Sequence, residues 1–218
     1  MRPFLDRKEA GKALATLLAT SARPEPVLVL ALPRGGVPVA AEVAHTLGAP
    51  LDVLVVRKLG TPGQPELAMG AIAGGGVRVL NESLVRALGL RSEDIDAVAE
   101  AEAREIERRE RAYRGDRPAL EPAGATVILV DDGMATGATM RAAVAAIRQR
   151  GAARVVVAVP HAPREVCRSL RREADEVVCV HTPEPYMAVG QWYVHFPQLT
   201  DREVCAALAA LPPKSTSS

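Results

Sequence analysis

The feature that most constrains the fold is a thirteen-residue run from Val127 to Thr139. Four apolar residues lead into two adjacent carboxylates, a turn rich in Gly and Thr follows, and an Ala-rich helical stretch comes next. This order predicts a buried strand, a polar loop at its carboxyl end and a helix N-terminus. The free N–H groups and positive dipole end of such a helix bind phosphate. Two neighbouring acids can hold sugar hydroxyls or Mg²⁺, so one loop carries parts for both ends of a sugar phosphate.

Length and composition favour one α/β domain, or a core with a small appendage. Of the 218 residues, 48% are hydrophobic but only 3% are aromatic, which predicts a core of Ala, Val and Leu. The formal net charge of +1 argues against a protein that coats nucleic acid or an anionic membrane. Three cysteines without a CxxC pair argue against a disulfide framework or a zinc site.

The beginning of the chain meets acidic residues before any apolar core, so we expect no signal peptide. No apolar run reaches the ~18 residues of a membrane span. Together with the cysteine content, these features predict a cytoplasmic protein with no membrane partner.

Short apolar runs alternate with helical patterns, which predicts a Rossmann-like parallel sheet flanked by helices on both faces. The strands are predicted at 27–32, 51–56, 126–130, 154–159 and 176–180. The helices are predicted at 6–18, 37–47, 92–113, 136–150, 163–173 and 200–211. Segment 59–76 is expected to be loop-like, with a β-hairpin of 68–73 and 77–80 across three glycines, and 182–197 is expected to be irregular.

The predicted domain organisation is a single domain over residues 1–211. Its core covers about 27–180, with a lid or insertion at about 59–116. A hood is expected at about 181–200, together with the N-terminal segment. Residues 21–26 are expected to be a linker, and 212–218 a disordered tail.

Three strand ends carry polar or glycine-rich residues: Pro33 to Gly36, Arg57-Lys58, and Asp131 to Thr139. The carboxyl ends of parallel strands meet at one edge of a sheet, and ligands bind there. We therefore expect these three segments to converge on one binding site.

At these positions the chain resembles a type I phosphoribosyltransferase. The run 127–139 is similar to that family's signature for phosphoribosyl pyrophosphate (PRPP), and Leu32-Pro33-Arg34-Gly35-Gly36 is similar to its pyrophosphate loop. Basic residues such as Arg57-Lys58 often follow the next strand in the family. The resemblance covers about 27–180. Segments of the form Leu-Gly-x-Pro, Gly-Ala-Ile and Val-Gly-Gln-Trp-Tyr are also similar to a little-characterised bacterial subgroup, which supplies no acceptor.

The resemblance implies a Mg²⁺-dependent pentosyl transferase that moves 5-phosphoribosyl from PRPP to a nitrogenous base. The implied catalytic residues are Asp131, Asp132, Arg34 and Lys58. The two acids would hold the ribose hydroxyls and meet metal only indirectly, through those hydroxyls or water. The implied 5′-phosphate site is Gly133, Met134, Ala135, Thr136, Gly137, Ala138 and Thr139. The implied pyrophosphate site is Arg34, Gly35, Gly36, Arg57 and Lys58, with a Pro33–Arg34 peptide that is often cis in the family.

The aromatic residues near the C-terminus have two interpretations. Trp192, Tyr193 and Phe196 form either a small hydrophobic lid or dimer contact, or a hood that stacks on a planar base, and Tyr186 is another candidate for base binding. A homodimer is compatible with the family. Ala135 stands where hypoxanthine–guanine-type relatives carry an Asp that assists at the purine N7, so this position is more similar to adenine-type or unassigned members.

Other functions fit the sequence less well. No G-x-x-x-x-G-K-[ST] motif occurs, which removes the phosphate cradle of a nucleotide triphosphatase. The arginines of 104–117 mostly stand four residues after a glutamate, which is typical of a solvated, ion-paired helix face. His161 and His181 follow strands and are expected to be structural. The remaining alternatives are a regulator that senses PRPP or a nucleotide, and an enzyme that hydrolyses PRPP.

Overall fold

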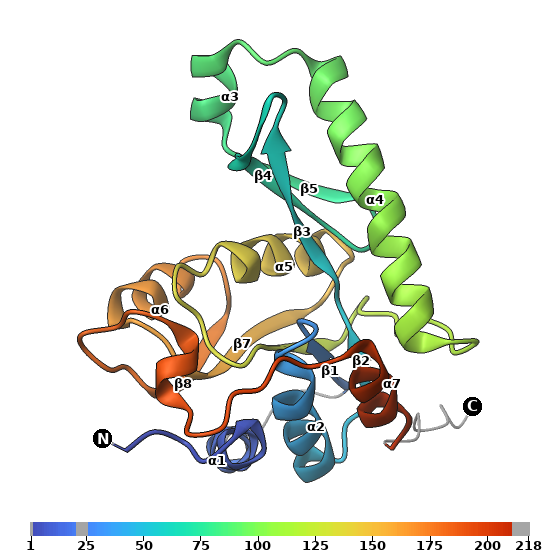
Figure 1. Cartoon of the computed structure of the whole chain (residues 1–218). Coiled ribbons are helices and arrows are strands. Elements are labelled where there is room, and N and C mark those ends of the chain that lie inside the picture. Colours follow the sequence, from blue (N-terminus) through green and yellow to red (C-terminus); the bar gives the residue numbers. More distant parts are fainter. Residues whose placement is uncertain (1, 21–25, 211–218) are drawn as a thin grey trace.

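The computed structural model describes residues 2–20 and 26–210, and a five-stranded parallel sheet of order β2-β1-β6-β7-β8 lies at its centre (Figure 1). The strands are β1 (Val27–Ala31), β2 (Leu51–Val53), β6 (Thr126–Val130), β7 (Arg154–His161) and β8 (Glu176–His181). Every position of β1 and β6 is buried. Continuously apolar strands need cover on both faces, so the predicted Rossmann-like parallel sheet is confirmed.

Helices cover the two faces of this sheet and divide the core in two. The first face carries α1 (Arg7–Ala19), α2 (Gly36–Leu47) and α7 (Asp201–Ala209), and the second carries α5 (Ala138–Gln149) and α6 (Arg164–Leu170). Alternate residues of each strand serve opposite faces, as the pleat requires. In β1, for example, Val29 packs with the first group of helices and Leu30 with the second.

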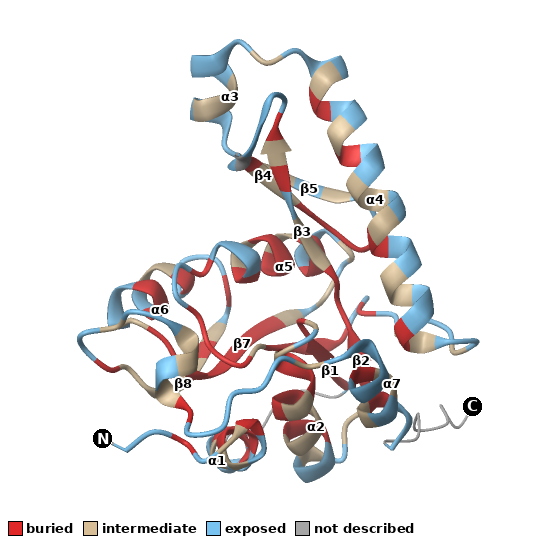
Figure 2. Cartoon of the chain, viewed as in Figure 1, coloured by how far each residue is buried: buried red, intermediate tan, exposed pale blue. Residues whose placement is uncertain are grey.

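A second, antiparallel sheet of order β3-β4-β5 extends away from the parallel sheet, with two helices beside it (Figure 1). These elements are β3 (Val56–Thr61), β4 (Gln64–Ala73), β5 (Val77–Leu80), α3 (Glu82–Leu88) and α4 (Ser92–Arg114). We call residues 56–114 the arm. It occupies most of the segment predicted as a lid or insertion, and the lid role itself stays a prediction. Figure 2 shows buried residues concentrated in the parallel sheet and far fewer along α3.

The arm corrects two expectations. Residues 51–56 are not one strand, because β2 ends at Val53 and the chain leaves the parallel sheet before β3 begins. Segment 59–76 is not loop-like: the hairpin of 68–73 and 77–80 is confirmed, and β3 pairs with β4 as well. Pro62 and Gly63 lie in the turn between these strands, where glycine and proline are at home.

Other boundaries differ by a few residues. The first turn of α5 begins at Ala138 rather than 136, because its N-cap Gly137 has φ +74°. The short helix α3 was not predicted, although Asn81 caps its N-terminus and Gly89 ends it. The capping box of α7, Thr200 with Glu203, is confirmed. Segment 182–197 is irregular apart from one 3₁₀ turn, Val189–Trp192.

The predicted tail at 212–218 and most of the predicted linker at 21–26 lie outside the described residues. Within 2–20 and 26–210, no helix has both the length and the apolar character that crossing a membrane requires.

Candidate active site

The acid pair, Asp131 and Asp132, directly follows β6 at the edge of the sheet where β1 also ends. Ala31 and Val130, the last residues of these two strands, are register partners in the parallel ladder. Because the strands end side by side, the loop after β1 and the loop after β6 lie at the same edge. The structure thus brings together two of the three segments that the sequence placed in one site.

Both carboxylates of the acid pair are held by hydrogen bonds. Asp132 Oδ2 accepts from Arg7 Nε at 2.9 Å, an ion pair whose side chains are only 10% and 12% exposed. Asp131 Oδ1 accepts from the backbone N–H of Asp132 at 2.8 Å. Burial and the adjacent charge raise the pKa of Asp131 well above its usual range. Burial also raises the pKa of Asp132, while Arg7 acts in the opposite direction.

The loop after β1 packs directly on the acid pair. A Cβ added at Gly35 would overlap Asp132 Oδ2, and one added at Gly36 would lie 2.6 Å from Val130 O. Only glycine fits at such close approaches. The preceding Pro33–Arg34 peptide bond is cis. The glycines of this loop therefore set the distance between it and the two carboxylates.

The loop of residues 133–139 leads from the acid pair into α5. Its exposed members are Ala135, Thr136, Ala138 and Thr139, and its buried members are Gly133, Met134 and Gly137. The N–H groups of the first turn of α5 have no acceptor within the helix, and the positive end of the helix dipole adds to their field. Ala138 N donates to Thr136 Oγ1 at 3.4 Å, and both Ala138 and Thr139 are exposed residues. The turn therefore offers backbone donors that suit an anion such as phosphate.

Arg141, on the second turn of α5, supports this loop from one side. Its Nη1 donates to Thr136 O at 2.9 Å and its Nη2 to Ser169 Oγ at 2.6 Å. A guanidinium can hold two acceptors in fixed directions. The loop is thus fastened to α6 through one side chain, and its backbone is ordered before any anion arrives.

Arg34 and Gly35 line a cavity of about 330 Å³ together with one member of the acid pair, Asp132, and with part of residues 192–199, which we call the C-terminal segment. The other lining residues are Arg7, Asp132, Phe196, Pro197, Gln198 and Leu199. The Arg34 side chain is 41% exposed, and its Nη1 lies 3.8 Å from Asp201 Oδ1. This cavity is the space that adjoins both the 33–36 loop and a carboxylate of the acid pair.

Arg57 and Lys58 do not lie at the edge of the parallel sheet where the sequence placed them. They are inside β3 of the arm, not at the end of a strand of the parallel sheet. Arg57 forms an ion pair with Glu102 of α4, and Lys58 is exposed. Neither residue lines the cavity beside the acid pair. Their contact with pyrophosphate stays a prediction.

The three aromatic residues predicted to bind a base contact other parts of the protein: Tyr186 and Trp192 stack on each other, and Tyr193 packs on Phe4, His161 and Phe196 beside the acid pair. Tyr193 is 6% exposed, and its hydroxyl donates to Asp132 O at 2.6 Å. The Tyr186 hydroxyl lies 3.0 Å from His161 Nδ1, and its ring stacks on Trp192 with centroids 6.3 Å apart. Burial raises the pKa of both tyrosines. Their base-binding role stays a prediction, and Phe196 is the aromatic residue that lines the cavity.

His161 has a structural place, as expected. It is fully buried at the end of β7, and a Cβ at Gly133 would come within 2.5 Å of its ring. Its backbone carbonyl accepts from Met134 N at 3.1 Å. Burial lowers the pKa of His161 to about 4, with a smaller contribution from His181. The neutral ring therefore forms a wall against which the first residues of the 133–139 loop pack.

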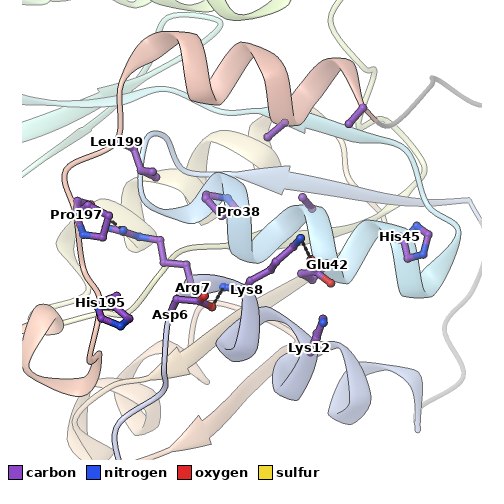
Figure 3. A pocket seen from close by; sticks show the side chains of 13 residues that line it. Asp6, Arg7, Lys8, Lys12, Pro38, Glu42, His45, His195, Pro197 and Leu199 are labelled. Atoms are coloured by element: carbon purple, nitrogen blue, oxygen red, sulfur yellow. Dashed lines mark hydrogen bonds and ion pairs between the residues drawn. The ribbon is translucent and has the colours of Figure 1, made fainter.

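A larger cavity of about 920 Å³ lies between α1, α2, α7 and the C-terminal segment (Figure 3). It is separate from the acid pair, whose residues do not line it, but Arg7, Pro197 and Leu199 line both cavities. We place the candidate site at the smaller cavity, because of these two cavities it is the one lined by both the buried Asp132 carboxylate and Gly35 of the 33–36 loop.

The acid pair fits Mg²⁺ only as part of a shared shell. Among residues 2–20 and 26–210, no group of three or more His, Cys, Asp or Glu side chains is arranged to hold a metal ion. Mg²⁺ characteristically uses one or two carboxylates together with waters and substrate phosphates. Two adjacent aspartates beside an anion-binding loop are compatible with that mode and with no dedicated protein cage.

Two site residues were not identified from the sequence, Arg7 and Arg141. Arg7 is 125 residues from its partner Asp132. It is the first residue of α1, where the helix dipole makes a cation unfavourable. Arg141 lies inside an ordinary amphipathic helix pattern. Neither position carries a local sequence signal, because both roles depend on segments that meet only in the folded chain.

Comparison with known families matches a phosphoribosyl transferase domain over residues 5–190. Two curated Mycobacterium tuberculosis relatives, from strains CDC 1551 and H37Rv, are each 50% identical over 208 residues and bear phosphoribosyl transferase as a provisional name. These matches include 95% of this chain and 47% of each relative, so the chain spans about half the length of the curated relatives.

Among solved structures, the crystal structure of TT1426 from Thermus thermophilus is similar over almost its full length. It is 44% identical, with a TM-score of 0.84, and the match covers 97% of this chain and 99% of that one.

Proposed function

Because the chain belongs to the phosphoribosyl transferase domain family, we propose that it transfers the 5-phosphoribosyl group of PRPP to a nitrogenous base. The observation that carries the proposal is the packing of the 33–36 loop on Asp131 and Asp132, beside the start of α5. These three parts suit the pyrophosphate, ribose and 5′-phosphate of a single substrate.

In the proposed reaction, a ring nitrogen of the base attacks C1′ as the bond from C1′ to pyrophosphate breaks. Pyrophosphate leaves with the electron pair of that bond and takes up the proton released by the attacking ring nitrogen. The configuration inverts, and C1′ passes through an oxocarbenium-like state as in other glycosyl transfers. The protein supplies no nucleophile. Its tasks are to orient the two reactants, exclude water and stabilise the charge that grows on the leaving group.

Each task has candidate residues on this edge of the sheet. The N–H groups at the start of α5 would hold the 5′-phosphate, and the acid pair would accept hydrogen bonds from the ribose hydroxyls. Arg34 would meet the growing negative charge of pyrophosphate, because its guanidinium lines the same cavity as Asp132. Bound Mg²⁺ would neutralise further charge on the pyrophosphate.

The test measures pyrophosphate release from PRPP and Mg²⁺ with a panel of bases. We expect release that depends on one class of base and disappears in the double variant Asp131→Asn/Asp132→Asn, whose fold is checked by circular dichroism. Asp116→Asn is the matched control, because Asp116 is exposed in the turn that follows α4 and does not line the cavity. Saturating PRPP, at ~100 times its dissociation constant, should stabilise the wild type by about 2.7 kcal/mol.

Three outcomes would contradict the proposal. Full activity in the double variant would show that the acid pair takes no part in the reaction. If PRPP did not stabilise the protein, PRPP would not be its substrate. Pyrophosphate released at the same rate with and without a base would replace transfer by hydrolysis of PRPP.

A further inference from the structure

Arg7 is buried at a position where a helix by itself does not favour a cation. It is the first residue of α1, follows the N-cap Asp6, and is 8% exposed. The positive end of the helix dipole repels a guanidinium at this point, and burial removes its hydration. Contacts outside α1 must therefore compensate, and the structure provides three.

The guanidinium of Arg7 contacts the acid pair and the C-terminal segment at once. Nε donates to Asp132 Oδ2 at 2.9 Å, Nη1 donates to Pro197 O at 2.9 Å, and the central carbon lies 3.8 Å from the centroid of the Phe196 ring. A planar group with donors in fixed directions can make such contacts simultaneously, whereas an ammonium group cannot.

The backbone on either side of these contacts is joined as well. Phe4 N donates to Trp192 O at 2.9 Å, and Val194 N donates back to Phe4 O at 2.8 Å. His195 N then donates to Leu5 O at 2.9 Å. Residues 4–5 and 192–195 thus form a short ladder that leads directly into Arg7, and this ladder sets where the guanidinium can reach.

The next cation on α1 does not share this role. Lys8 points toward Glu42 of α2, with Nζ 4.0 Å from Oε1, whereas Arg7 reaches toward Pro197 (Figure 3). The Lys8 side chain is 72% exposed and lines only the larger cavity. The two neighbours therefore form a natural pair in which one contacts the acid pair and the other does not.

We propose that Arg7 is a positioning residue of the active site that fixes the Asp132 carboxylate beneath the 33–36 loop and fastens residues 192–199 over it. The proposal rests on the proposed function, in which Asp132 receives a ribose hydroxyl. With one oxygen held by Arg7, the carboxylate cannot rotate, so the hydroxyl meets an acceptor that is already oriented. The N-terminal helix thereby becomes part of the substrate site.

Two readouts separate positioning from a merely structural role. The first is KM for PRPP against kcat, because loss of folded protein lowers the apparent kcat and leaves KM unchanged. The second is acrylamide quenching of tryptophan fluorescence, which reports on the C-terminal segment because Trp192 is the sole tryptophan of the chain. Quenching needs no substrate, so it tests the fastening even if the proposed reaction is wrong.

We expect Arg7→Ala to raise KM for PRPP about thirtyfold or more, as for loss of one partner of a buried charge pair, and to increase quenching of Trp192. Arg7→Lys should give an intermediate KM, because it keeps the charge without the fork. Lys8→Ala is the matched control and should change neither readout. A folded Arg7→Ala variant with wild-type KM or wild-type quenching overturns the proposal.

Phe196→Leu keeps the ion pair and removes the stacked ring, so it tests the fastening even if Arg7→Ala does not fold. It should increase quenching of Trp192 with a smaller rise in KM. Quenching equal to the wild type in this variant overturns the fastening. A different result separates the two proposals. If the wild type releases no pyrophosphate from PRPP but quenching increases in both variants, the proposed reaction is wrong, and the role of Arg7 in holding residues 192–199 is retained.

Discussion

The strands of the parallel sheet and those of the arm are held in place differently. All positions of β1 and β6 are buried between two layers of helices. In β3 of the arm only Leu59 and Thr61 are buried, and Lys58 is exposed. A strand enclosed on both faces cannot shift without breaking close packing. Loops at the end of such strands are therefore better suited to hold a substrate than the strands of the arm.

Charged contacts take a large part in joining the arm to the parallel sheet. Arg114, at the end of α4, donates to Asp52 of β2 at 2.8 Å and to Glu110 at 2.9 Å, and it also donates to Val53 O. The Arg114 and Asp52 side chains are only 12% and 7% exposed. The comparison thus sets a site at the ends of strands enclosed by apolar packing against an arm whose attachment includes a buried ion cluster. Four variants test this difference.

The largest expected effect concerns that attachment. Arg114→Ala leaves the Asp52 carboxylate buried without its cation, so we expect a loss of about 3–5 kcal/mol in the free energy of unfolding. Urea denaturation measures it. The control, Arg86→Ala, removes an exposed pair with Glu82 on α3 and should change stability by less than about 1 kcal/mol. Equal effects of the two variants would show that burial of the ion cluster does not matter.

His161 tests the packing behind the site through the pH dependence of stability. Its pKa is about 4 in the fold against 6.5 when unfolded. Between these values the unfolded chain binds the proton and the folded chain does not, so its contribution is present above pH 6.5 and is lost as the pH falls toward 4. Wild type should lose up to about 3 kcal/mol more than His161→Gln between pH 7 and 4.

Denaturation curves of both proteins across this range provide the measurement. The acid pair titrates with the opposite sign, since its raised pKa values favour the fold as the pH falls, and this contribution cancels in the difference between the two proteins. Parallel pH profiles for wild type and His161→Gln would contradict the prediction.

Gly35 tests whether close packing on the acid pair controls the chemistry. In Gly35→Ala the new Cβ would overlap the Asp132 carboxylate, so one of the two groups must move. A displacement of about 1 Å can reduce turnover ~100-fold, and kcat/KM for pyrophosphate release should fall by that order. In the control Gly63→Ala, in an arm turn, a Cβ meets nothing within 4 Å. Because the φ of Gly63 is +78°, alanine is strained there, so this control should lose some stability but keep kcat/KM unchanged. Similar losses of kcat/KM in both variants would show that packing of Gly35 on the acid pair has no special effect on the reaction.

The smallest effect is expected for a substitution of Lys58, which tests whether the arm contributes to substrate binding. An exposed lysine that contacts pyrophosphate should contribute no more than about 1 kcal/mol, which corresponds to a two- to fivefold rise in KM for PRPP in Lys58→Ala. Its melting temperature should match the wild type, because Lys58 is exposed. A KM identical to the wild type would confine the pyrophosphate contacts to the 33–36 loop.

Local patterns were sufficient to predict the sheet, but they failed where the chain changed sheets. Continuous apolar runs identified β1 and β6, since only strands covered on both faces have that pattern. Residues 51–56 are apolar except for Asp52 and were predicted as another such strand, yet the chain turns away after Val53 and begins β3 at Val56. Apolar residues indicate that a strand is buried, but they do not indicate which strand it pairs with. The antiparallel sheet of the arm therefore had no sequence signature apart from its hairpin.

The candidate site shows the same division. The acid pair and the loop that leads to α5 lie within one stretch of sequence, and their order along the chain is enough to place them at a strand end and a helix start. The contact of Arg7 with Asp132 spans 125 residues. No periodicity or spacing encodes such a contact, because it depends on how α1 packs across the end of the sheet.

By itself, the sequence determined the parallel α/β core and the acidic, glycine-rich loop at its edge, because burial pattern and turn chemistry act over a few residues. The side chains that complete that edge became visible only in the folded chain: Arg7 on the acid pair, Arg141 beside the 133–139 loop, and the Tyr193 hydroxyl on the backbone carbonyl of Asp132. The physical reason is that charge pairing and close packing act through space, between segments whose distance along the chain carries no information about their contact.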